Sequence, residues 1–114
     1  NYTLEEDDDF IFLFRLLKEF NKIKEMLEFV NYRASAKILL GIVDDVFVKE
    51  KDKLLKQLMT RLISVSYYGN IASKKDEVEL LDWIISKYDQ SDLEVFRKNR
   101  YLRSTFVLDK LGFN

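Results

Sequence analysis

The absence of proline constrains the fold of this chain more than any other feature of its sequence. Its 114 residues include three glycines, Gly41, Gly69 and Gly112, and no proline. Proline breaks helices, and glycine supplies the positive φ angles of tight β-hairpin turns, so few positions here could interrupt a helix or close a hairpin. We therefore expect an all-α fold.

The composition predicts a folded domain rather than a disordered segment. Hydrophobic residues make up 47% of the chain and aromatic residues 14%, which is enough apolar material for a core and too much for intrinsic disorder. We predict a single helical domain over residues 1–114, in which the acidic segment 1–8 frays. The chain starts at Asn1 without methionine, so we expect a trimmed or mature form of a longer product.

The spacing of apolar residues predicts where the helices lie. Apolar side chains recur at the helical intervals i, i+3, i+4 and i+7. The segments that show this pattern are 9–30 (in two pieces), 33–48, 52–68, 74–88 and 92–111. The inward face of 74–88 is predicted to consist of Glu77, Leu81, Ile84 and Tyr88.

The links between these segments predict how the helices pack. The connections from 33–48 to 52–68 and from 74–88 to 92–111 are short, and short connections favour antiparallel helical hairpins. We predict a compact bundle of about six helices. A short HEAT/ARM-like helical repeat fragment is the alternative, although no repeated signature is found in the chain.

Residues typical of helix ends support these segments. Three pairs fit the capping box, in which each side chain bonds to the other residue's backbone; they are Thr3 with Glu6, Ser73 with Asp76 and Ser91 with Glu94. Gly69-Asn70 and Gly112 are predicted stops, because these residue types tolerate the left-handed conformation that ends helices. Gly41 lies inside 33–48, and we attribute it to the close approach of a neighbouring helix.

Missing residue types exclude most enzymatic chemistry. The chain has no histidine and no cysteine, which removes the usual general base, the common metal ligands and the thiol nucleophile. The glycines are too far apart to form a phosphate-binding loop. We predict a non-enzymatic protein with no catalytic, cofactor-binding or metal-binding residues. A carboxylate-dependent enzyme that uses Glu79 and Asp82 is the last alternative, against the simpler interpretation of a solvated surface pair.

The first candidate surface is aromatic. Phe10, Phe12 and Phe14 lie among apolar residues that cover more than one stripe of the N-terminal helix. Such a helix is either buried on several sides or exposes a hydrophobic patch that binds a partner. Tyr67 and Tyr68 precede a predicted helix end, and amphipathic tyrosine suits an interface. These five aromatic residues are the predicted partner-binding residues.

The second candidate surface is basic. Residues 97–103 contain four positive charges and an aromatic side chain: Arg97, Lys98, Arg100, Tyr101 and Arg103. Such a segment can hold phosphates while a base stacks on the aromatic ring, and it also suits an acidic partner. The simpler interpretation is a solvated helix face whose cations pair with Asp89, Asp92 and Glu94.

The charge of the chain favours a protein partner over nucleic acid. The net charge is −1, and the five consecutive acidic residues Glu5 to Asp9 account for more than that, so the remainder carries +4. This excess is far below that of a dedicated nucleic-acid-binding domain. No apolar run approaches the ~20 residues that cross a bilayer, so no membrane span is predicted.

We therefore expect an intracellular module, cytoplasmic or nuclear, that binds another protein or its own copy in an adaptor, regulatory or assembly role. The intracellular setting rests on the absence of cysteine, because a chain without cysteine cannot form the disulfides that are typical of secreted domains. A helical nucleic-acid-binding domain that uses 97–103 is the alternative. No cofactor and no small-molecule substrate is predicted.

Overall fold

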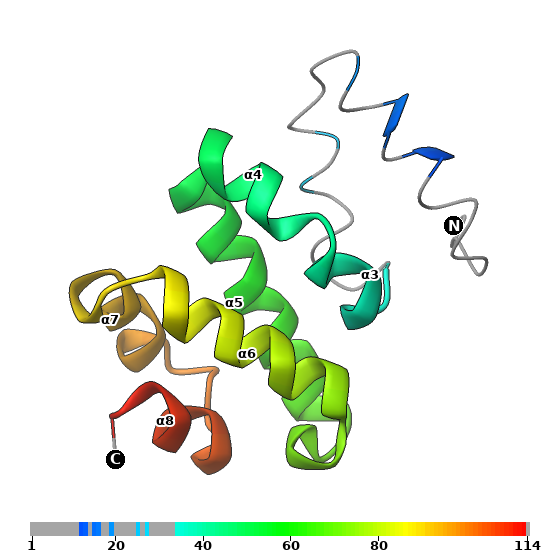
Figure 1. Ribbon diagram of the computed structural model, residues 1–114. Helices are drawn as coiled ribbons and strands as arrows, with labels where there is room; N and C mark the ends of the chain where they lie inside the picture. Colours follow the sequence, from blue (N-terminus) through cyan, green and yellow to red (C-terminus); the bar gives the residue numbers. More distant parts are fainter. Residues whose placement is uncertain are drawn as a thin grey trace. The chain divides into compact units, whose positions relative to one another are not determined.

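The computed structural model describes residues 34–113 and seven separate residues before them that have helical backbone: Phe12, Leu13, Arg15, Leu16, Glu19, Glu25 and Leu27. Within 34–113 the elements are α3 (Ala36–Leu40), α4 (Val43–Lys49), α5 (Lys51–Tyr68), the 3-10 helix η1 (Ile71–Ser73), α6 (Lys75–Lys87), α7 (Gln90–Lys98) and α8 (Thr105–Leu111) (Figure 1). No strand occurs in this range. The predicted all-α fold is confirmed, and the antiparallel hairpins stay a prediction.

The chain divides into two units, and the division falls inside α5. The first unit ends at Arg61 and the second begins at Leu62. In the first unit, α3, α4 and the first half of α5 contribute the fully buried Leu39, Val43, Val46, Leu54 and Leu58 to the core. In the second unit, α6 contacts η1 and α8, and α7 contacts α8 (Figure 1). The prediction of a single domain stays a prediction.

The predicted helix 33–48 is wrong in one respect, because it is interrupted in its middle. The N–H of Gly41 bonds to the carbonyl of Ile38, and the N–H of Ile42 bonds to that of Leu39. These bonds connect residues three apart and replace the four-residue spacing of an α-helix. The chain thus forms α3 and α4 in place of one continuous helix.

Gly41 does not mark the close approach of a neighbouring helix, and that interpretation is also wrong. Gly41 is exposed. Among the described residues, a Cβ atom added there would come within 4 Å of the carbonyl oxygen of Ile38 alone, in the same segment, at 3.3 Å. Glycine costs about 1 kcal/mol relative to alanine inside a helix, and this low propensity is consistent with an interruption at Gly41.

A buried arginine that the sequence analysis did not single out holds the start of α3. The Arg61 side chain is 4% exposed. Its Nη1 atom donates a hydrogen bond of 2.8 Å to the carbonyl of Ala34, 27 residues earlier in the chain. Ala34 immediately precedes Ser35, whose hydroxyl caps α3 by accepting the N–H of Ile38. Arg61 thus ties α5 to the N-terminus of α3.

The inward face of α6 is confirmed. Glu77, Leu81, Ile84 and Tyr88 are all buried, together with Leu80. The half-buried Trp83 ring meets the Tyr88 ring edge to face, at a centroid distance of 6.2 Å.

Two predicted capping boxes are wrong, one in its register and one because α6 has no side-chain cap. The box at α7 is formed by Asp89 and Asp92: the Asp89 carboxylate accepts the N–H of Asp92 at 2.9 Å, and the Asp92 carboxylate accepts the N–H of Asp89 at 3.4 Å. Ser91, the predicted first member, donates its hydroxyl to the Asp89 carboxylate. Ser73 belongs to η1, and α6 begins after Lys74 without a side-chain cap. Thr3 and Glu6 lie outside the described residues.

Both predicted stops, Gly69-Asn70 and Gly112, lie where helices end. Asn70 does not adopt the predicted left-handed conformation. Gly112 follows α8 with φ of 85°, the left-handed conformation that favours glycine. α5 ends at Tyr68, but Asn70 is extended, and its side chain caps η1 by accepting the N–H of Ala72 at 3.1 Å.

Candidate partner-binding surfaces

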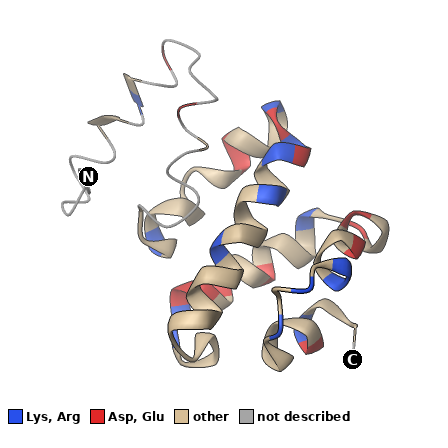
Figure 2. Cartoon of the chain, turned by 180° about the vertical axis from the view of Figure 1, so that it is seen from behind, with Lys and Arg blue, Asp and Glu red and all other residues tan. Residues whose placement is uncertain are grey.

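The basic segment 97–103, called the basic loop below, lies at the end of α7 and in the connection to α8. Arg97, Lys98, Arg100, Tyr101 and Arg103 are all exposed. Figure 2 shows lysine and arginine at the end of α7 and along this connection, with no acidic residue between them. The structure thus presents all five predicted residues of this surface to solvent.

Contacts within the basic loop and directly after it hold its backbone. The Asn99 side chain accepts the N–H of Tyr101 at 2.9 Å, and the Asn99 carbonyl accepts the N–H of Leu102 at 3.2 Å, which makes a turn. Leu102 is buried. After the loop, Ser104 caps α8 by accepting the N–H of Val107. The backbone of the loop is therefore held by hydrogen bonds from within the chain.

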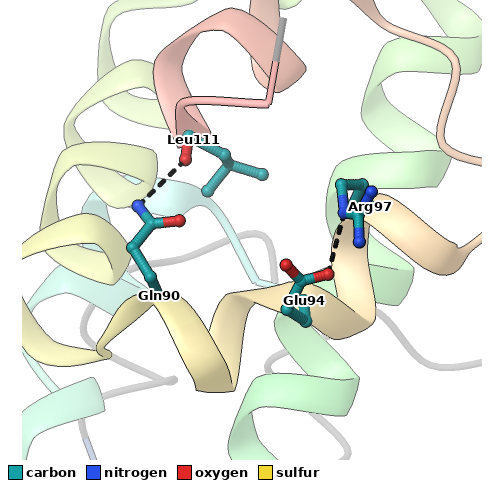
Figure 3. Close-up of polar contacts among 4 residues, drawn as sticks. All are labelled: Gln90, Glu94, Arg97 and Leu111. Atoms are coloured by element: carbon teal, nitrogen blue, oxygen red, sulfur yellow. Dashed lines mark hydrogen bonds and ion pairs between the residues drawn. The ribbon is translucent and has the colours of Figure 1, made fainter.

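A second set of contacts joins the helices on either side of the basic loop. The side-chain amide of Gln90, at the start of α7, donates to the carbonyl of Leu111, at the end of α8, at 3.3 Å (Figure 3). Lys110 of α8 pairs with Asp82 of α6 at 2.7 Å. These contacts connect α8 with both α6 and α7.

Arg100 and Tyr101 form one composite side-chain surface. Arg100 Nη2 donates to the Tyr101 hydroxyl at 2.7 Å, and its guanidinium carbon lies 4.9 Å from the centre of the tyrosine ring. The Tyr101 side chain remains 63% exposed. Arg103 Nε donates to the backbone carbonyl of Arg100 at 3.4 Å, so the two guanidinium groups belong to the same turn of the chain.

Most cations of the basic loop are not neutralised by neighbouring carboxylates. Arg97 pairs with Glu94 at 2.8 Å (Figure 3), as the simpler interpretation of this segment predicted. Among the residues that the structure describes, no acidic side chain pairs with Lys98, Arg100 or Arg103. Three positive charges therefore face solvent unpaired within this part of the chain.

The predicted aromatic surface is described only in part. Tyr67 and Tyr68 end α5 and are each 81% exposed, with their rings edge to face at a centroid distance of 4.9 Å. Phe12 is 66% exposed. Phe10 and Phe14 lie outside the described residues. The tyrosine pair is thus a solvent-exposed aromatic surface at a helix end.

The predicted carboxylate pair consists of surface residues. Glu79 and Asp82 are exposed, and Asp82 pairs with Lys110. No cluster of three acidic side chains placed to hold a metal ion occurs in the described part of the chain. In that same part, no helix has both the length and the hydrophobicity needed to cross a membrane.

Comparisons of the chain with protein-family models, with curated proteins and with solved structures found no match.

Proposed function

We propose that this chain is a non-enzymatic helical module that binds another protein, or a second copy of itself, in an adaptor, regulatory or assembly role. The proposal rests on one observation, the exposure of the adjacent Tyr67 and Tyr68 rings at the end of α5. The setting that we propose is intracellular, since a chain without cysteine needs no oxidising compartment.

The physics of tyrosine explains why this pair supports binding. A tyrosine side chain buries on the order of 150–250 Å² when a partner covers it, and its hydroxyl still finds hydrogen bonds at the rim of an interface. Tyrosine also has only two flexible torsions, so its ordering costs little entropy. The Tyr67 and Tyr68 rings also contact each other edge to face.

The test compares the chain with a variant that carries Tyr67→Ser and Tyr68→Ser. Light scattering after size exclusion measures self-association, and affinity capture from the source cells measures binding of other proteins. We expect the double variant to weaken a partner complex or a dimer at least about tenfold, since tyrosines are frequent hot spots. The control is Val48→Ser, which removes a single apolar side chain that is 80% exposed on α4.

Two results would contradict this proposal. One is a strict monomer from which no protein is recovered. The other is a complex that survives the double tyrosine variant and loses no more affinity than with Val48→Ser.

Nucleic acid binding is less well supported as the function. The chain carries a net charge of −1, which is not the strongly basic charge of a dedicated nucleic-acid-binding domain. A dedicated nucleic-acid-binding domain spreads a basic surface over a face or a helix. No observation on the described residues favours the carboxylate-dependent enzyme.

A further inference from the structure

The basic loop has hydrogen-bond donors that its own contacts leave available. A guanidinium group has five N–H donors in a planar fork, and this fork matches a carboxylate in a two-point contact. Arg100 directs Nη2 to the Tyr101 hydroxyl, and Arg103 directs Nε to a backbone carbonyl. Both side chains therefore keep N–H groups for an external anion, and the Tyr101 hydroxyl keeps its own hydrogen.

The charge distribution in the second unit indicates how large that anion is. Residues 62–114 contain eight acidic and eight basic residues, and four of the basic residues lie in the basic loop. The rest of this unit therefore carries a net charge of −4. A long polyanion that extended beyond the loop would run onto a unit whose remaining charge is net negative, whereas a short anionic segment would meet the loop alone.

The backbone of the loop sets a similar limit on length. Seven fully extended residues span at most about 25 Å, and the turn at Asn99 makes the basic loop shorter than that. Its cations are thus concentrated over a few residues. Arginine forks beside an exposed tyrosine ring suit a peptide, whose carboxylates take the guanidinium groups while its backbone or an apolar side chain covers the ring.

We propose that the basic loop is the docking site for a short acidic peptide segment of a partner protein. Arg100 and Arg103 bind its carboxylates, Lys98 adds a third positive charge, and Tyr101 packs against the peptide. This inference rests on the proposed function as a protein-interaction module, and it names a second contact surface and the chemistry of the partner there.

The experiment is a fluorescence anisotropy titration of the full chain with a labelled peptide that has five consecutive acidic residues in a Gly-Ser background. The matched peptide carries Gln and Asn in their place. We expect the acidic peptide to bind, the neutral peptide not to bind, and the affinity to fall as NaCl rises from about 50 to about 300 mM, because salt screens exposed charges.

Two triple variants separate the loop from net charge. Lys98→Gln, Arg100→Gln and Arg103→Gln remove the unpaired cations, and Lys49→Gln, Lys53→Gln and Lys56→Gln remove three other exposed charges. We expect the loop variant to weaken peptide binding roughly tenfold, as three exposed charge pairs allow, and the control variant to leave it within about twofold. Circular dichroism and thermal melting verify that both variants fold. Equal losses in the two variants would overturn the assignment.

A single-stranded oligonucleotide of matched length is the competing ligand. If it binds more tightly than the acidic peptide and its binding is lost in the loop variant, the loop is a nucleic-acid site and the inference is overturned.

The chain's own acidic run, Glu5 to Asp9, can compete with the peptide in the assay, so the peptide is also titrated into a variant with these residues changed to amides. If the peptide binds neither to the parent chain nor to this amide variant, the inference is overturned.

The two proposals fail separately. The peptide titration does not use Tyr67 or Tyr68, and the Tyr67→Ser, Tyr68→Ser variant should bind the acidic peptide as the parent chain does. Loss of peptide binding with intact tyrosine-dependent capture overturns the docking site alone. If the peptide binds but no complex depends on the tyrosines, the proposal that Tyr67 and Tyr68 bind a partner protein is overturned.

Discussion

The start of α3 in the first unit and the start of α7 in the second unit are held by bonds of different range. In the second unit, the Asp89–Asp92 box connects residues three apart, and Gly112 ends α8 by its own backbone conformation. In the first unit, Ser35 caps α3 locally, and Arg61 adds a bond to Ala34, just before that cap, from 27 residues away. The Asp89–Asp92 box needs only the residues of its own helix end, whereas the Arg61 bond also needs α5 to pack near the start of α3.

The strongest test of this difference is Arg61→Met. The variant leaves the carbonyl of Ala34 without its buried partner, and a hydrogen bond to a charged group contributes about 1.5–3 kcal/mol. We expect a loss of about 2–3 kcal/mol in the free energy of unfolding, measured by urea denaturation. Hydrogen exchange of the α3 amides should accelerate more than that of α7.

Arg97→Met is the matched control for that variant. It makes the same substitution at an exposed arginine whose ion pair with Glu94 lies on the surface. Exposed ion pairs contribute about 0–1 kcal/mol, so this variant should change stability little. Similar losses at the two positions would show that the Arg61 bond does not hold the first unit.

An intermediate effect is expected from Asp89→Ala in the second unit. Removal of an N-cap side chain costs about 1 kcal/mol, and the effect should be confined to the first turn of α7, where hydrogen exchange detects it. Asp89→Asn keeps a capping oxygen and should recover most of the loss. A change in exchange that spreads to α6 and α8 would contradict a purely local role for this box.

The smallest effect on stability is expected at Ser66, whose side chain makes neither a local capping bond nor a long-range hydrogen bond within the part of the chain that the structure describes. The Ser66 hydroxyl is buried in α5 and has no hydrogen-bond partner among the described residues. Ser66→Ala removes an unsatisfied polar atom and raises helix propensity, so the free energy of unfolding should stay the same or rise by about 0.5 kcal/mol. A thermal melt that shows clear destabilisation would mean that the hydroxyl has a partner in solution.

The candidate surfaces could be predicted from the sequence because exposure follows from local pattern. Tyr67 and Tyr68 stand at a helix end marked by Gly69, and the basic loop concentrates charges that are rarely buried. Sequence reasoning could not decide which cations find carboxylates. Arg97 reaches Glu94 one turn earlier on the same helix, whereas the turn at Asn99 places Arg100 against Tyr101.

The sequence by itself determined that the described chain is helical, which face of α6 is buried and where α5 and α8 end. These properties depend on periodicity and on residues close together in the chain, so the linear sequence is enough to predict them. Only the tertiary structure decided that α3 and α4 are separate helices and that Arg61 is buried against Ala34. Arg61 follows the buried Leu54 and Leu58 at helical spacing, but a charged residue at that position is stable only when packing brings it a partner.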